Sequence, residues 1–210
     1  MLIDVLKGFL IGICASAPLG PIAILVIQLS LSKGRNAGFV AGLGSVLVDT
    51  VYSIIAIFAL AFVQGFLSDN RDWFLLAGGV IVAALGTSMM FSNPFRKVTS
   101  EMPDSTISPK DFLKAVAMGF SNPGAVLVIF ALFAFFGVGT DQNWNVAPVI
   151  LSVAGGAALY WLGFATIISR FRKVIRVTSI IWVNRITGAI VIVLGLALAA
   201  DGAFSLIFLK

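Results

Sequence analysis

Residues 15–23 read ASAPLGPIA, and they interrupt an apolar run that is long enough to cross a membrane. This run has no charged residue between Gly8 and Leu31, yet it contains both Pro18 and Pro21. Proline removes a backbone N–H and clashes with the carbonyl one turn earlier, which costs about 3 kcal/mol in a helix interior. In hydrocarbon, such a break is tolerated only where it is buried in protein or lines a cavity. The stretch therefore predicts a discontinuous membrane helix.

A second uncharged run, Ala115–Thr140, carries Pro123 directly after Asn122. Gly20 and Asn122 each precede a proline, so each stands where a second half-helix would begin. Interrupted hydrophobic segments at corresponding positions of two halves indicate a transport site near the bilayer midplane. We therefore expect helices 1 and 4 of the membrane domain to be broken at proline.

The composition of all 210 residues is that of a membrane protein. Sixty per cent are hydrophobic and 11% are charged, whereas a soluble domain has about 25% charged residues. A span needs roughly 20 apolar residues. We expect an all-α integral membrane protein with six transmembrane helices, and we place them as follows: Gly8–Leu31, Ala37–Ser68, Trp73–Phe95, Ala115–Thr140, Gln142–Ser169 and a sixth within Val177–Ala200.

The polar, proline-rich residues 93–111 separate residues 1–92 from residues 112–210, with three expected helices on each side. Residues 19–26 align weakly with 121–128, and residues 79–86 with 188–195. An odd number of crossings inverts a second copy, so the sequence predicts two inverted three-helix repeats joined by a cytoplasmic linker. The alternative is that apolar helices match one another by composition alone.

Basic residues fall mainly in the first, third and fifth expected loops, where there are eleven, against Arg71 alone in the other two. Cytoplasmic loops carry an excess of lysine and arginine, so both termini are expected on the periplasmic side. The net charge of +5 thus reflects the orientation of the protein in the membrane. We therefore expect contact with lipid rather than with nucleic acid. The eleven are Lys33, Arg35, Arg96, Lys97, Lys110, Lys114, Arg170, Arg172, Lys173, Arg176 and Arg185.

The beginning of the chain has some features of a cleavable signal peptide, with Lys7, a short apolar stretch and then Ala15-Ser16-Ala17. The residue after such a cleavage site would be Pro18, and the apolar run continues beyond it. We expect a retained first span.

Asp49 is the one charge within Ala37–Ser68. A charge at the centre of a span costs about 2.5–3.5 kcal/mol and normally faces the bundle interior on an ion or substrate path. The sequence has no histidine, so a proton inside the membrane would have to be carried by a carboxylate. Asp49 is our candidate for proton coupling. It could instead bond a backbone carbonyl freed by the proline breaks, or lie nearer the lipid headgroups.

The broken helices are the expected substrate site. A half-helix N-terminus at membrane depth offers free N–H groups and partial positive charge, which suits the α-carboxylate of an amino acid. Asn122 is also an expected N-cap whose amide could reach substrate. The candidate substrate-binding residues are Pro18, Gly20, Pro21, Asn122 and Pro123, with Gln28 and Tyr160 as further pocket candidates.

The residue types needed for disulfides, metal sites and enzyme catalysis are scarce or absent in the sequence. Cys14 is the one cysteine, which excludes an internal disulfide and a cysteine-rich metal site. No cofactor or metal is expected, and no enzyme, because there is no histidine base, paired carboxylates or Gly-x-Ser-x-Gly signal. Gly38, Gly42 and Gly44 favour close helix packing inside the monomer, with a homodimer seam as the alternative.

The sequence resembles the LysE/RhtB-type translocators, a family of bacterial amino-acid exporters. The resemblance rests on APLGP at 17–21, SKGRNAG at 32–38 and GLG at 42–44 with Asp49, then on FLKAVAMG at 112–119 with Asn122-Pro123, and on residues 184–196. It implies a six-span exporter of amino acids or related metabolites in the bacterial inner membrane, driven by the proton gradient. It also implies that Asp49 and the two proline motifs line the path. Many members carry a basic residue where this chain has Gly124, so that contact is not transferred.

The expected function is therefore a secondary transporter that exports amino acids or related small metabolites, by proton antiport and alternating access. A divalent-cation exporter is the alternative within transport, although one in-span carboxylate without histidine leaves a metal short of ligands. A non-transporting structural or assembly protein is the other, and it would leave Asp49 and the proline pair without a purpose.

Overall fold

The computed structural model describes residues 2–17, 20–91, 108–137, 146–170 and 177–208, and all regular structure there is helical. The expectation of an all-α protein is confirmed. The helices, in chain order, are α1 (Leu2–Ser16), α2 (Pro21–Ser32), α3 (Arg35–Phe91), α4 (Pro109–Phe120), α5 (Pro123–Phe136), α6 (Val146–Arg170) and α7 (Val177–Phe208).

The two expected helix breaks are present. The helix pair α1 and α2 is bent by 79°, and the pair α4 and α5 by 71°. Three further segments, Arg35–Leu60, Val146–Arg170 and Gly188–Phe208, are each long and apolar enough to cross a membrane. The described residues thus contain three candidate spans, or five if each bent pair is one span. The six-span count and the inverted repeat stay predictions.

The breaks follow from local backbone chemistry. Pro21 and Pro123 each occupy the first turn of a new helix, where the missing N–H would have no intrahelical partner. Gly20 precedes α2 in an extended conformation and gives it no side-chain cap. Asn122 precedes α5, and its side-chain oxygen accepts a hydrogen bond from the Gly124 N–H at 3.1 Å. Each proline therefore begins a helix and does not kink a continuous one.

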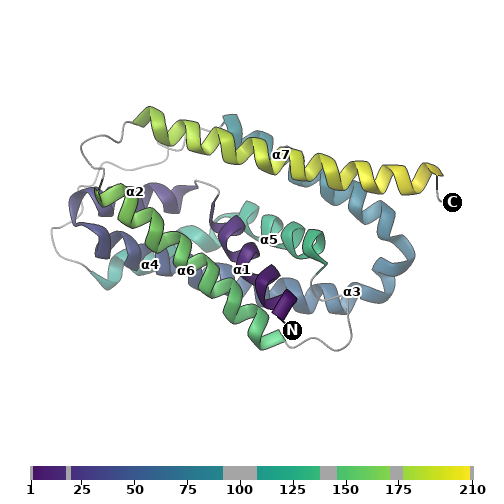
Figure 1. Ribbon diagram of the computed structural model, residues 1–210, viewed down its shortest axis with the longest axis horizontal. Helices are drawn as coiled ribbons and strands as arrows, with labels where there is room; N and C mark the ends of the chain where they lie inside the picture. Colours follow the sequence, from purple (N-terminus) through teal and green to yellow (C-terminus); the bar gives the residue numbers. More distant parts are fainter. Residues whose placement is uncertain (1, 18–19, 92–107, 138–145, 171–176, 209–210) are drawn as a thin grey trace.

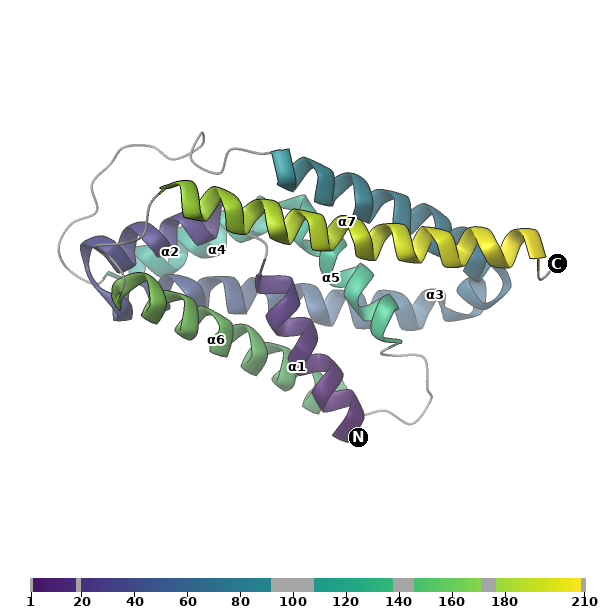
Figure 2. The ribbon, with the colours of Figure 1, turned by 45° about the horizontal axis from the view of Figure 1, so that its top comes forward.

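Helix α3 contributes to two layers. Its first part, Arg35–Leu60, lies in the main bundle, and its later apolar part, Leu75–Ser88, runs back beside α7 (Figures 1 and 2). Glycines let these two backbones touch: a Cβ added to Gly86 would lie 2.7 Å from the Ile192 nitrogen. On α7, a Cβ added to Gly188 would lie 2.9 Å from the Gly86 carbonyl oxygen. The second part of α3 and α7 form a closely packed antiparallel pair.

The main bundle contains two parallel helix contacts of the same kind. Gly8 and Gly12 of α1 face Val149 and Val153 of α6 in the same direction along the chain. In the second contact, a Cβ on Gly44 of α3 would lie 2.7 Å from the Phe112 carbonyl oxygen of α4. Glycine at these positions permits backbone contact, which is how helices associate in lipid.

The glycines Gly38 and Gly42 also pack inside the chain. A Cβ added to Gly38 would clash with the Ser30 side chain of α2, and one added to Gly42 would lie 2.7 Å from Cβ of Trp161. These contacts support the interpretation of tight packing within the monomer. A homodimer stays a prediction.

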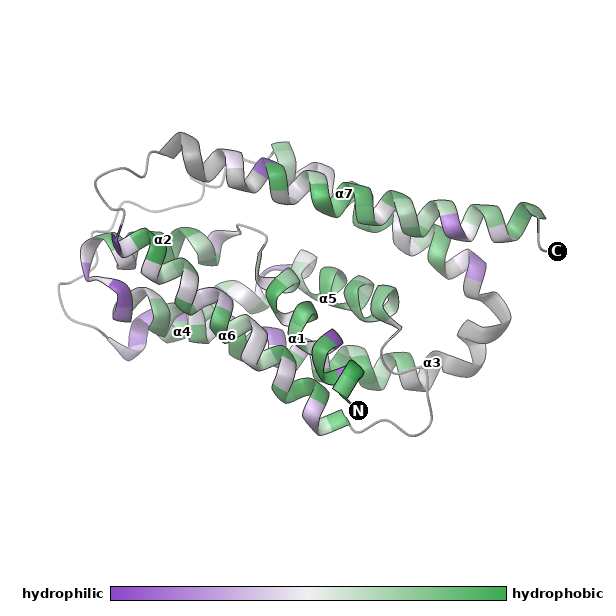
Figure 3. Ribbon diagram, in the orientation of Figure 1, coloured by the Kyte–Doolittle hydropathy of each residue, from purple (hydrophilic) through white to green (hydrophobic). Residues whose placement is uncertain are grey.

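The hydropathy of the surface fits a protein surrounded by lipid. Figure 3 shows hydrophobic residues along the length of α6 and α7, and large apolar side chains such as Leu151 and Ile207 are exposed on them. Leu151 is 71% exposed, a fraction that favours a lipid contact for this side chain.

Two boundaries differ from expectation. Helix α4 begins at Pro109 because Ser108 and Asp111 form a capping box, so the last residues of the expected linker, Pro109–Asp111, are helical. Helix α7 continues past Ala200 through Asp201, and its membrane-length segment is Gly188–Phe208. Residues 92–107 of the expected linker lie outside the described residues.

Candidate functional site

A cavity of about 710 Å³ lies where the two broken spans meet α3 and α6. Both breaks contribute to its wall, through Gly20 and Pro21 on one side and Asn122 and Gly124 on the other. Trp161 of α6 and Leu85 of α3 add apolar surface. The polar side chains on the wall, apart from the Trp161 indole, are Ser16, Ser45, Asp49, Ser88, Ser121 and Asn122.

Asp49 lies on this wall and is 5% exposed. The Ser16 hydroxyl donates to Oδ2 of Asp49 at 3.2 Å. Because Ser16 ends α1, this hydrogen bond links the first part of α3 to the first break. The side chain thus faces the bundle interior, as its cost in lipid requires. Its described hydrogen-bond partner is a hydroxyl and not a carbonyl freed by the break.

The two breaks approach each other across the cavity. A Cβ added to Gly20 would lie 3.7 Å from Nδ2 of Asn122. Oδ1 of Asn122 is used to cap α5, which leaves the amide nitrogen directed toward the first break. The N-terminus of α2 has no side-chain cap. Pro21 has no N–H and the Ala23 N–H donates to the Gly20 carbonyl oxygen at 3.1 Å, so the Ile22 N–H is the first-turn donor that this helix start could offer to a ligand.

A tyrosine supports each break from a neighbouring helix. The Tyr52 hydroxyl of α3 donates to the carbonyl oxygens of Gly119 and Phe120, each at 3.4 Å, where α4 ends. The Tyr160 hydroxyl of α6 donates to the Ala17 carbonyl oxygen, also at 3.4 Å, just after α1. The Gly119 carbonyl also accepts from the Asn122 N–H at 3.1 Å, so the tyrosines add side-chain donors to carbonyls at the breaks.

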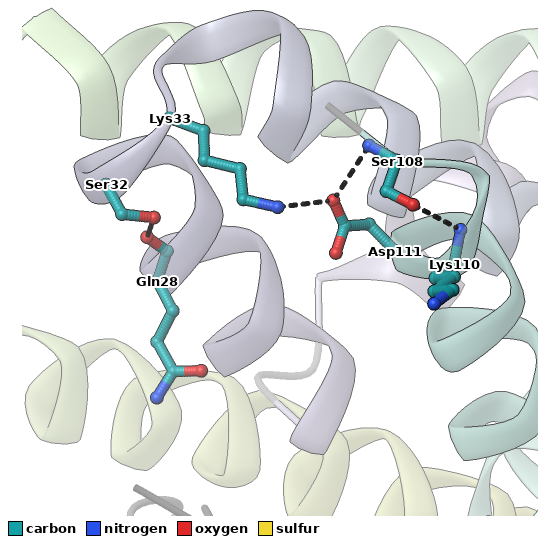
Figure 4. A network of polar contacts seen from close by, with 6 residues as sticks. All are labelled: Gln28, Ser32, Lys33, Ser108, Lys110 and Asp111. Atoms are coloured by element: carbon teal, nitrogen blue, oxygen red, sulfur yellow. Dashed lines mark hydrogen bonds and ion pairs between the residues drawn. The ribbon is translucent and has the colours of Figure 1, made fainter. Parts of the chain in front are cut away.

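The structure places the remaining predicted residues less centrally. Pro18 lies outside the described residues. Gln28 is half-buried on α2 and is not among the cavity residues; its carbonyl accepts a hydrogen bond from the Ser32 hydroxyl at 2.7 Å (Figure 4). Tyr160 contacts the first break but does not line the cavity. None of these positions tests a role in binding, so the roles stay predictions.

Sequence reasoning missed four hydroxyl groups of the cavity, those of Ser16, Ser45, Ser88 and Ser121. Serine is common in membrane helices, where it can bond the carbonyl four residues earlier, as Ser121 does with Ala117 at 2.8 Å. The residue type alone therefore gave no signal. Trp161, which is 2% exposed, also lines the cavity.

The charge balance of the cavity limits its chemistry. Asp49 is the one acidic side chain among the described wall residues, and none of these is basic. Nowhere in the described part of the chain do three or more His, Cys, Asp or Glu side chains gather as a metal site would require. The cavity combines one carboxylate, several hydroxyls, an amide and an open helix N-terminus, which are groups that bind a small polar molecule.

Membrane-length apolar helices around an internal polar cavity define a multi-pass membrane protein of the transporter class. A family model described as LysE type translocator matches residues 13–202. The chain therefore belongs to the LysE type translocator family. This membership confirms the resemblance in the sequence, and it confirms that the protein is a translocator and not an enzyme.

Two curated relatives are called threonine efflux protein. They come from Escherichia coli (strain K12) and Escherichia coli O157:H7, and each is 24% identical over 158 residues, covering 72% of this chain and 76% of the relative. The uncharacterized membrane protein YahN of Escherichia coli (strain K12) is 29% identical over 111 residues, covering 52% of this chain and 50% of that protein. No solved structure matches the chain.

Proposed function

We propose that the protein exports amino acids or related small metabolites across the bacterial inner membrane by proton antiport. The observation that carries the proposal is the buried Asp49 carboxylate on the wall of a cavity bordered by both proline breaks. Family membership makes the protein a translocator, and the names of the E. coli relatives favour amino-acid efflux. Substrate binds from the cytoplasm, and Asp49 takes up a periplasmic proton and releases it inside.

The proposed substrate orientation follows from the two breaks. The carboxylate of an amino acid lies against the N-terminus of α2, where N–H groups and the helix dipole favour an anion. The amide nitrogen of Asn122, directed toward Gly20, is the second donor. These two donors replace the water that the carboxylate loses on entering the membrane.

Alternating access fits an inverted repeat, and three matched contacts support it. Pro123 follows Pro21 by 102 residues, and Gly119 follows Ala17 by the same interval. The first matched contact involves the two tyrosines of the chain. The Tyr52 hydroxyl donates to the Gly119 carbonyl, and the Tyr160 hydroxyl donates to the carbonyl of Ala17, the residue that corresponds to Gly119.

The other two matched contacts are between helices. The parallel pair α1 and α6 matches the parallel pair α4 and first part of α3. Gly79 contacts Gly195, and Gly86 contacts Gly188, as the alignment of 79–86 with 188–195 requires. Two halves related in this way can rock about the cavity and expose it to each side in turn.

The proposed orientation uses the distribution of basic residues. The C-terminal ends of α2 and α6 and the N-terminal ends of α3 and α4 lie together at one end of the molecule, at the left in Figure 1. These helix ends carry Lys33, Arg35, Lys110, Lys114 and Arg170, and we call this the basic end. The positive-inside rule places the basic end in the cytoplasm and both termini in the periplasm.

The two alternatives have less support. A divalent cation requires several oxygen ligands, and the described cavity wall offers one carboxylate. A structural protein would have no use for a buried, uncompensated acid beside a cavity, because its burial costs free energy that a neutral side chain would not.

Efflux from proteoliposomes loaded with isotopically labelled amino acids tests the proposal. Asp49→Asn should abolish the dependence of efflux on a pH gradient while substrate exchange at equal pH continues, because the amide keeps the shape and loses the titrating proton. Asp201→Asn is the matched control, since Asp201 is an exposed carboxylate on α7 away from the cavity. Gradient-driven efflux that persists in Asp49→Asn would remove Asp49 from proton coupling.

A further inference from the structure

An ion pair joins the two halves of the chain at the basic end. Nζ of Lys33 lies 2.9 Å from Oδ2 of Asp111, and the two side chains are only 2% and 7% exposed (Figure 4). Lys33 is the C-cap of α2, and Asp111 lies in the first turn of α4. A charge pair this dry, between residues 78 apart in sequence, is unusual on the outer end of a membrane protein.

The capping of α4 does not require the lysine. Oδ2 of Asp111 accepts a hydrogen bond from the Ser108 N–H at 3.3 Å, and the Ser108 hydroxyl accepts one from the Lys110 N–H at 3.2 Å. These two bonds complete the capping box. Lys33 is an addition to a helix start that is already satisfied, so its role lies in the connection to α2.

Helices α2 and α4 both lead from the cavity to this ion pair. Helix α2 begins at the first break and α4 ends just before the second, and each contains 12 residues. At 1.5 Å per residue each is about 18 Å long. Each is joined to the rest of its span through a bend, of 79° or 71°. The two helices thus run from bends at the cavity to outer ends that the ion pair joins.

We propose that Lys33 and Asp111 are positioning residues that latch α2 to α4 and close the cavity toward the basic end. The latch rests on the proposed transport function, because opening it admits substrate. When α2 and α4 separate, the ion pair breaks and substrate reaches the N-terminus of α2 from that side. When they meet again, the cavity is shut at this end while it opens at the other.

The location makes such a latch reversible. A charge pair deep in hydrocarbon cannot be separated, since neither ion would find water. At the outer end of α2 and α4, separation lets water reach both ions and return their hydration. The closed state thus gains the attraction between the ions, and the open state gains their solvation. This balance holds two states close in free energy, as alternating access requires.

The opposite end lacks this ion pair. By the interval of 102 residues that relates the prolines, Lys33 corresponds to Phe135 and Asp111 corresponds to Phe9. The two aligned positions on α5 and α1 therefore carry aromatic side chains, although Asp4 and Lys7 stand nearby at the N-terminal end of α1. In the proposed repeat, packing at these two aligned positions is made by aromatic side chains and not by a lysine and an aspartate. The pair is a specialisation of the basic end.

Chemical labelling measures whether the latch closes the cavity. A cysteine in place of the cavity residue Ser121, in a Cys14→Ser background, reports access by a membrane-impermeant thiol reagent. The reagent is added to the basic end in inside-out vesicles. Lys33→Gln should raise the rate of labelling about tenfold, the factor that corresponds to a shift of 1.4 kcal/mol toward the open state. Lys33→Arg keeps the charge and should restore slow labelling.

Two matched controls separate the latch from general loosening. Lys110→Gln removes a neighbouring exposed charge, and Ser108→Ala removes the cap of α4 while the ion pair stays; both should label slowly. Asp111→Asn together with Lys33→Gln removes both charges without leaving one unpaired, and it should label as fast as Lys33→Gln alone.

Equal labelling of Lys33→Gln and Lys110→Gln would overturn the latch, and so would equal labelling of Lys33→Gln and Ser108→Ala. The labelling rate does not depend on proton coupling. A failure of the latch is therefore distinct from a failure of the Asp49 experiment.

Discussion

The two broken spans are alike in shape and differ in what they leave exposed. Both bend by more than 70°, both restart at proline, and both have a carbonyl at the break bonded by a tyrosine. At corresponding positions before the prolines, however, the first break has Gly20 and the second has Asn122. The second helix start is capped by its own side chain, and the first is open. Of the two similar breaks, the first therefore has the helix N-terminus at which we propose that a ligand binds.

The two halves also differ in whether they place an acidic side chain at the cavity. Tyr160 follows Tyr52 by 108 residues, and by this interval Asp49 corresponds to Ala157. Asp49 lines the cavity, whereas Ala157 has no exposed surface and packs against α1, where a Cβ on Gly12 would lie 2.9 Å from its nitrogen. In the proposed inverted repeat, the matched halves would supply the moving parts, and unmatched residues such as Asp49 would supply the chemistry.

The largest effect is expected from placing an acid at the matching position. Ala157→Asp should destabilise the protein by about 3 kcal/mol, because its carboxylate would be buried at a helix contact without a cavity. Thermal unfolding of the purified protein in detergent measures this loss. Asp49→Ala is the control and should fold normally, since it removes a buried charge. An Ala157→Asp variant as stable as the parent would show that the two positions are interchangeable.

The sequence was sufficient for features that are local. The bends at Pro21 and Pro123 follow from the missing N–H of proline. The inward position of Asp49 follows from the cost of a charge in lipid. Both arguments need only a residue and its immediate neighbours in the chain.

Contacts between distant helices were not predictable in the same way. In the sequence, Lys33 is one of several loop charges and Asp111 ends the expected linker, and nothing there predicts that they meet or that Tyr52 contacts the second break. A helix that is hydrophobic on all sides, such as α7, does not reveal which face meets its neighbours. The rotation of each helix decides these contacts, so they became visible only in the folded chain.

An intermediate effect is expected when the first break is given the cap of the second. Gly20→Asn supplies a side-chain oxygen to the open N-terminus of α2, where it would compete with a substrate carboxylate. The apparent KM for efflux should rise about tenfold, as loss of 1.4 kcal/mol of binding requires.

The Gly20→Ala variant is the matched control. Its methyl group would lie 3.7 Å from Nδ2 of Asn122, an ordinary contact, and it cannot cap the helix. It should keep the parental KM. If Gly20→Asn also transports with the parental KM, the substrate carboxylate does not bind at the open end of α2.

The smallest effect is expected from removing the tyrosine hydrogen bond that each break has. Tyr52→Phe and Tyr160→Phe each remove a hydroxyl that donates to a carbonyl at a break, so each should cost about 0.5–1.5 kcal/mol of stability. The two losses should be similar, because each hydroxyl has one hydrogen to donate and each contact is 3.4 Å long. Thermal unfolding of the two variants and of the double variant measures these terms. A loss in one variant and none in the other would show that the tyrosines do not play equivalent parts, and it would weaken the case for an inverted repeat at the point where its evidence is most specific.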